Sequence, residues 1–335
     1  MGRGRPPIRR AGETGEMAAG RVMAATPRPR VGVCILPEHP WAVARRMWQH
    51  AEDYGFDHAW TYDHMTWSRL PHWPWYAAMP TLAAAATATS RIQLGTFVSS
   101  PNNHHPVQFI REILALHDIS VGRFLLGVGA GGDVDAVVTG TSVALGQRTA
   151  RFREFTELLD ELLRRDGVTW SGSYFAATSA GSQPGPVNDE ASSGVPLLVA
   201  ANGPRGIRLA VERGDGWVTY GAKADDETAW WAAVGEAARR ADAEVARQSR
   251  VRPLPRYLGL DSAPDYPLQS IGCFEDALGR ATQLGFTDVV VTWPRPAQPY
   301  AASEAVLDEV AVRVLSRPVL PGDAPGRSLA VRCGD

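Results

Sequence analysis

The sequence predicts an α/β protein of the (β/α)8 barrel class. From Val31 almost to the end of the chain, short apolar runs alternate with longer segments of helical periodicity. Eight such runs can be counted, and each has the length of a buried strand. Eight strand–helix units over about 290 residues match a closed barrel, with an open doubly wound sheet as the main alternative.

The first half of the chain supplies four of these units. The predicted strands are residues 31–36, 57–62, 92–98 and 124–129, and the helices that follow them are 40–54, 79–89, 107–119 and 148–165. Pro40 suits a first helical turn, and Gly55 ends that helix. The apolar stripe of the fourth helix predicts either barrel core or a subunit contact. Its members are Phe152, Phe155, Leu159 and Leu162.

The second half supplies the other four units. The predicted strands are residues 196–201, 217–220, 254–260 and 288–293. Two of the predicted helices begin at Pro204 and Asp225, and a third, through Phe274 and Leu284, precedes the last strand. A last helix at residues 302–316 follows that strand. The seventh strand is the weakest, because Pro253 and Pro255 interrupt it. Residues 167–194, rich in Gly, Ser and Pro, predict an irregular insertion after the fourth unit, of the kind that often lies over a site.

Composition excludes several classes of protein. The net charge of −2 over 335 residues argues against a dedicated nucleic-acid binder. The three cysteines show no Cys-x-x-Cys spacing, and no apolar stretch is long enough to span a bilayer, so a cytoplasmic protein is expected. Residues 1–30, with seven arginines and two glutamates, predict a disordered leader before one domain at 31–320 and a tail at 321–335.

Chemistry-bearing residues gather after the second strand. Asp63 and His64 stand where the catalytic groups of a barrel lie, and a carboxylate beside a histidine can orient the ring and shift its pKa; the alternative is an exposed loop pair. Trp67, Trp73 and Trp75 crowd the loop that follows. They predict either an apolar pocket wall that accepts a ring-bearing substrate or packing of the loop on the barrel rim.

Two glycine-rich turns can also be interpreted either as parts of a binding site or as ordinary structure. Residues 127–132 match G-x-G-x-x-G, but they follow the fourth strand and lack the acidic partner of a dinucleotide fold, so a turn lying close to a flat cofactor explains them better. Asn202, Gly203 and Pro204 open a helix and predict an anion site or an ordinary turn. All eight histidines lie between His39 and His117 without metal-ligand spacing, so no metal is expected.

Several of these stretches, taken in order, resemble the bacterial luciferase-like superfamily, and within it the branch that uses the deazaflavin coenzyme F420. The resemblance covers about residues 31–295 and rests on short motifs spread along them. They are Gly55-Phe56-Asp57, Tyr62-Asp63-His64, residues 91–96, Pro106, Gly122-Arg123-Phe124, residues 127–129, residues 200–204 and residues 215–217.

The resemblance implies roles for individual residues. His64 matches the active-site histidine, and Asp63 matches a residue that contacts the coenzyme and would also hold His64. Phe97 and Val98 match a non-proline cis peptide behind the ring, and Gly129 belongs to the turn beside it. Ala201, Asn202, Gly203 and Pro204 match the segment that holds the coenzyme phosphate.

The resemblance also implies an activity, namely hydride transfer between the deazaflavin and a small organic substrate, and the tryptophan-rich loop indicates that this substrate bears a ring. A homodimer is a further expectation. The alternatives are an FMN-dependent monooxygenase that uses oxygen, a catalytically silent cofactor-binding barrel, and a metal hydrolase. Sugar-phosphate dehydrogenases of this branch carry a glutamate where this chain has Gly132, followed by Asp133, and they hold the phosphate with lysines. This chain has only Lys223, which disfavours glucose 6-phosphate.

Overall fold

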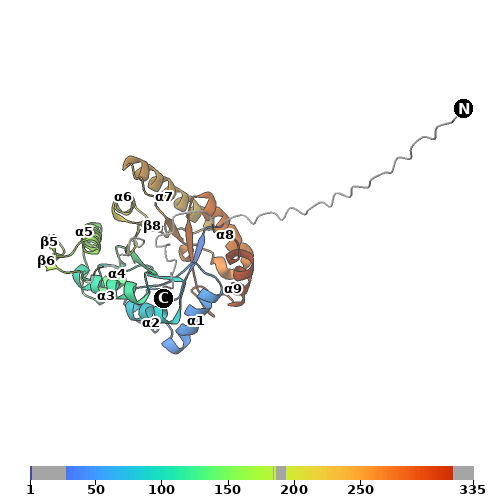
Figure 1. Ribbon diagram of the computed structural model, residues 1–335, viewed down its shortest axis with the longest axis horizontal. Helices are drawn as coiled ribbons and strands as arrows, with labels where there is room; N and C mark the ends of the chain where they lie inside the picture. Colours follow the sequence, from blue (N-terminus) through green and yellow to red (C-terminus); the bar gives the residue numbers. More distant parts are fainter. Residues whose placement is uncertain (2–27, 184, 186–193, 320–335) are drawn as a thin grey trace.

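Eight parallel strands close into a barrel, which confirms the predicted class and excludes the open sheet. The computed structural model describes Met1, residues 28–183, Gly185 and residues 194–319. Around the barrel the strands run β1-β10-β9-β8-β7-β4-β3-β2, and Figure 1 shows the helices arranged outside them. The strands are β1 (Arg30–Cys34), β2 (His58–Thr61), β3 (Gln93–Thr96), β4 (Phe124–Val128), β7 (Leu197–Ala200), β8 (Gly216–Thr219), β9 (Arg256–Gly259) and β10 (Asp288–Thr292).

Each predicted helix is present, with small shifts at its ends. The helices are α1 (Trp41–Asp53), α2 (Ala78–Ala88), α3 (Pro106–Ile119), α5 (Leu145–Arg164), α6 (Pro204–Arg213), α7 (Glu227–Arg247), α8 (Ile271–Gln283) and α9 (Ala305–Val310), which continues into the π-helical turn Ala311–Leu315. Polar caps start some of them: Asp226 accepts from the Ala229 N–H at 2.8 Å before α7. The short helix α4 (Asp133–Val138) and the single turns Leu260–Ser262 and Pro267–Gln269 were not predicted.

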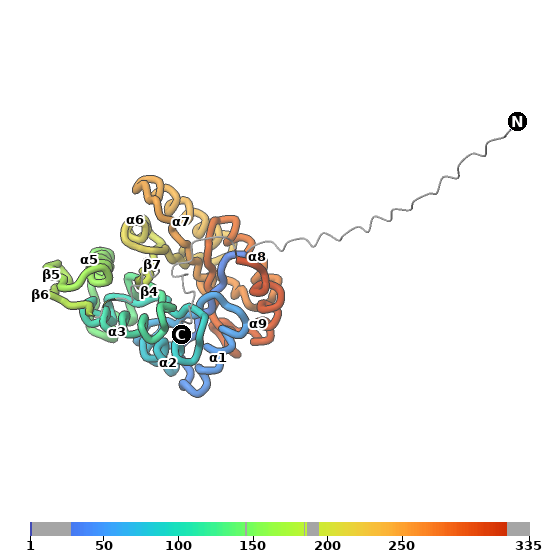
Figure 2. The backbone as a smooth tube through the Cα atoms, viewed as in Figure 1, coloured from blue at the N-terminus to red at the C-terminus, as the bar shows by residue number. Residues whose placement is uncertain are grey.

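The first part of the predicted insertion forms a hairpin at residues 168–180, so the prediction of irregular structure was wrong for these residues, while residues 184 and 186–193 of the same stretch lie outside the described residues. Strands β5 (Val168–Ser171) and β6 (Ala176–Ala180) pair antiparallel, and Figures 1 and 2 show them beside α5 at the periphery of the molecule. The Glu154 carboxylate of α5 accepts the N–H groups of the hairpin turn at 2.8 to 3.2 Å. That side chain orders a turn whose glycines and serines suggested no structure.

The ends of the predicted domain are only partly visible. Residues 2–27 and 320–335, and with them most of the predicted leader and the whole predicted tail, lie outside the described residues. Residues 28–30 belong to the barrel instead of the leader, because Arg30 begins β1 and Arg28 pairs with Asp57 at 2.6 Å. In the part of the chain that the structure describes, no helix combines the length and the apolar character needed to cross a bilayer.

The core lies between the barrel and the helices that cover it. The α5 stripe of Phe152, Phe155, Leu159 and Leu162 is buried there, which decides for barrel core over a subunit contact. Burial of these side chains provides the main driving force for docking α5 against the strands.

A polar network fills the lower end of the barrel, where the strands begin. The His58 ring is fully buried, with Nε2 at 3.0 Å from Asp288 Oδ1, and it accepts a hydrogen bond from Trp60 Nε1 at 2.6 Å through Nδ1. Arg30 lies 3.2 Å from the same carboxylate. Burial lowers the pKa of His58 despite Asp288, so the ring is a neutral donor to Asp288 and an acceptor from Trp60.

A second buried histidine, His117 on α3, provides a stability test. Neither of its ring nitrogens has a hydrogen-bond partner among the described residues, and burial lowers its pKa. Replacing it with leucine (His117→Leu) removes two unsatisfied polar atoms, so we expect the free energy of unfolding to rise by about 1 kcal/mol at pH 8. Denaturant unfolding measures this change, and a decrease would show that the ring makes contacts that leucine cannot replace.

The same variant should change the pH dependence of stability. Because the pKa of His117 is lower in the folded than in the unfolded protein, its contribution is present above the unfolded value of about 6.5 and is lost as the pH falls. We therefore expect the loss of unfolding free energy between about pH 7 and pH 5.5 to be smaller in His117→Leu. It should not vanish, because His58 also has a lowered pKa.

Candidate active site

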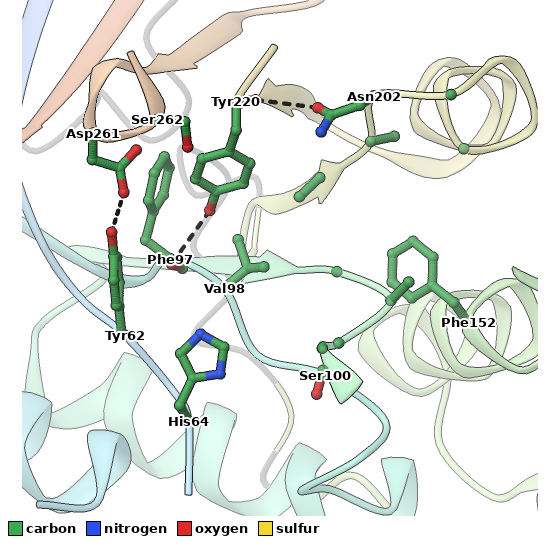
Figure 3. Close-up of a pocket in the computed structure, with 18 of the residues that line it drawn as sticks. Tyr62, His64, Phe97, Val98, Ser100, Phe152, Asn202, Tyr220, Asp261 and Ser262 are labelled. Atoms are coloured by element: carbon green, nitrogen blue, oxygen red, sulfur yellow. Dashed lines mark hydrogen bonds between the residues drawn. The ribbon is translucent and has the colours of Figure 1, made fainter. Parts of the chain in front are cut away.

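A cavity of about 800 Å³ opens at the carboxyl ends of the strands. The loops after β2, β3, β4, β7 and β9 and the segment around Tyr300 form its walls. Figure 3 shows Tyr62 and His64 on one side of this space and Asn202 on the other, with Phe97 and Tyr220 side by side between them. The two segments singled out in the sequence, one at His64 and one at Asn202, therefore share one mouth, and the space between them is open.

His64 projects into the cavity and is held from behind by Asp135 on α4. His64 Nδ1 lies 2.5 Å from Asp135 Oδ2, while Asp135 Oδ1 accepts the Met65 N–H at 2.8 Å. Burial favours the protonated carboxyl, but the hydrogen bonds from His64, Met65 and Thr66 outweigh it, so the pKa of Asp135 is lowered. The ionised carboxylate can only accept, and Nδ1 therefore carries the proton and leaves Nε2 for a ligand.

Asp63 does not hold the His64 ring, contrary to the expected role. Its Oδ2 atom accepts from Ser99 Oγ at 2.5 Å and lies 2.6 Å from His104 Nε2. The Asp63 side chain is mostly buried and is not among the residues that line the cavity. The residue that the sequence missed is Asp135, whereas Asp133, which the sequence pointed to, is exposed and pairs with Arg148.

The three tryptophans predicted to bind substrate occupy three different environments. Trp67 lines the cavity and stacks on Tyr300, with ring centroids 5.9 Å apart. Trp75 lies behind Trp67 and does not line the cavity, and its ring centroid is 6.4 Å from that of Tyr62. Trp73 is 52% exposed and covers Arg295, so its prediction as a pocket residue was wrong. The loop turns between these residues, which sends their rings in different directions.

The cavity floor is built around Phe97, Val98 and Gly129. The peptide between Phe97 and Val98 is cis, as the resemblance implied. A Cβ at Gly129 would lie 2.6 Å from Val98 Cγ2, so a side chain there would displace Val98. Tyr220, a lining residue that the sequence did not single out, donates from its hydroxyl to the Phe97 carbonyl at 3.3 Å.

The opposite wall is the N-terminus of α6. Ala201, Asn202, Gly203 and Pro204 all line the cavity. The Asn202 side chain is fixed, since its Oδ1 accepts from Thr219 Oγ1 at 2.8 Å and from the Tyr220 N–H at 3.2 Å. The free N–H groups and positive dipole end of a ten-residue helix make this wall suitable for an anion.

A half-buried carboxylate, Asp261, completes the site just after β9. It lines the cavity and accepts a hydrogen bond from the Tyr62 hydroxyl, and Tyr300 lies 3.4 Å from that hydroxyl. Burial raises the pKa of Asp261 despite Tyr62 and Arg69. No sequence pattern marked Asp261 or Tyr300, because each follows a strand in a loop without a motif. Among the described residues, no group of three or more His, Cys, Asp or Glu could hold a metal ion.

Together these features define a (β/α)8 barrel whose mouth holds an open cavity, with His64 on one wall and the N-terminus of α6 on another. A family model for luciferase-like monooxygenases matches residues 18–263, so the chain belongs to the luciferase-like monooxygenase family.

Curated relatives include F420-dependent enzymes. The chain is 37% identical over 177 residues to the F420-dependent glucose-6-phosphate dehydrogenase of Beutenbergia cavernae, covering 52% of this chain and 51% of that one. It is 30% identical over 228 residues to F420-dependent glucose-6-phosphate dehydrogenase 1 of Rhodococcus jostii, covering 66% and 65%. The chain spans about half the length of the first relatives that it matches.

Solved structures share the fold at low sequence identity. An F420-dependent secondary alcohol dehydrogenase in complex with an F420–acetone adduct matches with a TM-score of 0.63 and 18% identity, over 79% of this chain and 93% of that one. A monooxygenase from Streptomyces bottropensis matches with a TM-score of 0.67 and 17% identity, over 85% and 98%. At this identity the likeness concerns the fold.

Proposed function

We propose that this protein is an F420-dependent oxidoreductase that transfers a hydride between the deazaflavin coenzyme and a small organic substrate. The observation that carries the proposal is the His64–Asp135 pair, which projects into an open cavity opposite the N-terminus of α6. The F420-dependent relatives support the choice of coenzyme. The alternative remains the FMN-dependent monooxygenase, because monooxygenases share the fold.

The residues present fit such a coenzyme. The volume of about 800 Å³ lies in the range of cofactor pockets. At Gly129 the backbone itself forms the wall, as a flat ring requires, and α6 offers N–H groups to a phosphate. When bound, the deazaflavin would supply the hydride chemistry at its central carbon.

The protein would supply the proton. His64 Nε2 faces the cavity while Nδ1 donates to Asp135, so Nε2 can accept a proton from a substrate hydroxyl or, once protonated, return one. The ionised Asp135 would stabilise the charged ring during that exchange. Tyr62 and Asp261 lie on the same side of the cavity and would restrict how the substrate is oriented.

The cavity walls favour a substrate that carries a ring. Tyr62, Trp67 and Tyr300 form a continuous aromatic surface, since Trp67 lies 5.3 Å from Tyr62 and 5.9 Å from Tyr300, measured between ring centroids. Aromatic surfaces of this kind bind flat apolar groups well. Lys223 does not line the cavity, which fits a substrate other than a sugar phosphate.

The coenzyme assignment can be tested directly by mixing the purified protein with F420 or with FMN. We expect retention of the deazaflavin and no oxygen consumption in the presence of reduced coenzyme. Flavin-dependent oxygen uptake would instead establish the monooxygenase. Failure to bind either coenzyme would overturn the proposal.

Asp135→Asn tests how His64 is held. An asparagine amide would donate to Nδ1, so the ring proton would move to Nε2, and the atom that faces the cavity could no longer accept a proton. We expect kcat to fall on the order of 100-fold, with coenzyme affinity unchanged. The matched control is Asp133→Asn, because Asp133 is exposed and pairs with Arg148 on the surface. Equal losses in both variants would show that the carboxylate at 135 has no special role.

A further inference from the structure

A second cavity, of about 290 Å³, lies between α5 and α6 and carries a cluster of arginines. Arg153, Arg205 and Arg208 line it, and we call it the arginine groove. It shares lining residues with the main cavity, so the two cavities lie next to each other at the first turn of α6. The shared residues are Thr149, Phe152, Arg205 and Gly206. Figure 3 shows Phe152 on its helix at the edge of the main cavity, on the side toward the segment of Asn202.

The groove has an excess of positive charge. No acidic residue is among the described residues that line it. Arg208 has one carboxylate nearby, Glu244 at 3.5 Å, and that carboxylate also pairs with Arg247 at 2.5 Å. Arg153 is better matched, with Glu157 at 2.8 Å and Glu212 at 3.3 Å. Arg205 has no ion pair in the described ranges, and of the three groove arginines it is the one that also lines the main cavity.

We propose that the arginine groove binds the carboxylates of the glutamate chain that follows the phosphate of F420. This inference rests on the proposed function and extends it to the part of the coenzyme outside the pocket. A phosphate at the N-terminus of α6 would lie next to Arg205, and the chain that leaves it would meet the groove at once. Guanidinium groups recognise carboxylates through paired N–H donors. FMN ends at its phosphate and would leave the groove unused.

The experiment compares two ligands, F420 with its glutamate chain and a truncated deazaflavin that ends at the phosphate. Binding is measured by calorimetry for the wild type and for Arg208→Ala, Arg208→Lys and Arg205→Ala. The control is Arg239→Ala, which removes an exposed arginine of α7 that pairs with Glu236. Thermal unfolding of each variant checks that the fold is intact.

The proposal predicts a distinct pattern. Arg208→Ala should weaken F420 about fivefold to tenfold and leave the truncated ligand within about twofold, with Arg208→Lys in between. Arg205→Ala should weaken both ligands, because Arg205 borders both cavities. Added salt should reduce the difference between the two ligands.

Two results would separate this inference from the proposed function. If both ligands bind with equal affinity and Arg208→Ala changes neither, the groove has no role in binding, although the protein still uses F420. If neither ligand binds the wild type, the proposed function itself is wrong and the groove inference fails with it.

Discussion

His64→Ala is expected to lower kcat by about 1,000-fold while leaving the affinity for F420 within about twofold. The imidazole lines the cavity and has a carboxylate, Asp135, directly behind it. Its removal takes away the proton acceptor, but it leaves the floor at Val98 and the N-terminus of α6 intact. Steady-state turnover and calorimetric titration with the coenzyme measure the two effects separately.

The control for this prediction is His72→Ala, because His72 is an exposed residue of the same loop. It should leave both kcat and affinity unchanged. If His64→Ala kept wild-type turnover, another group would have to move the proton, and Asp261 would be the first to examine. If the wild type itself turned over no candidate substrate while it bound F420, the catalytically silent barrel would become the better explanation.

The barrel could be predicted because buried parallel strands leave continuous apolar runs in the sequence. Even the weakest run, at Pro253 and Pro255, proved to be strand β9, whose residues begin just after the second proline. Helix α4 was missed because six residues are too few for a helical period to appear. The β5–β6 hairpin was missed because hydrogen bonds to Glu154 order its turn, and apolar alternation does not reveal such contacts.

In the site, residues that directly follow strands could be predicted, whereas their partners from distant loops could not. His64 and the segment at Asn202 follow strands directly, so their place at the barrel mouth comes from the fold. The partner of His64 could not be found in this way, since Asp135 lies 71 residues away along the chain and on an unpredicted helix. The sequence showed two acidic residues there, and only the path of the loop decides which of them faces the histidine.

Gly32→Ala is expected to lower the free energy of unfolding by about 4 kcal/mol or to prevent folding altogether. A Cβ at this position in β1 would lie 1.8 Å from His58 Nδ1 and 2.8 Å from Trp60 Nε1. The ring cannot turn aside, because Asp288 and Trp60 hold both of its nitrogens. The yield of soluble protein and denaturant unfolding measure the effect.

The matched control is Gly279→Ala, at an exposed position in α8 where a Cβ meets nothing within 4 Å. That variant should gain about 0.5 to 1 kcal/mol, because alanine is the better helix former. The double variant Gly32→Ala/His58→Ala makes room for the new methyl group and should recover part of the loss, which is a favourable coupling between the two sites. If Gly32→Ala unfolded at the same denaturant concentration as the wild type, His58 would pack more loosely against β1 than the geometry indicates. The buried network around His58 would then not limit the size of the side chain at position 32.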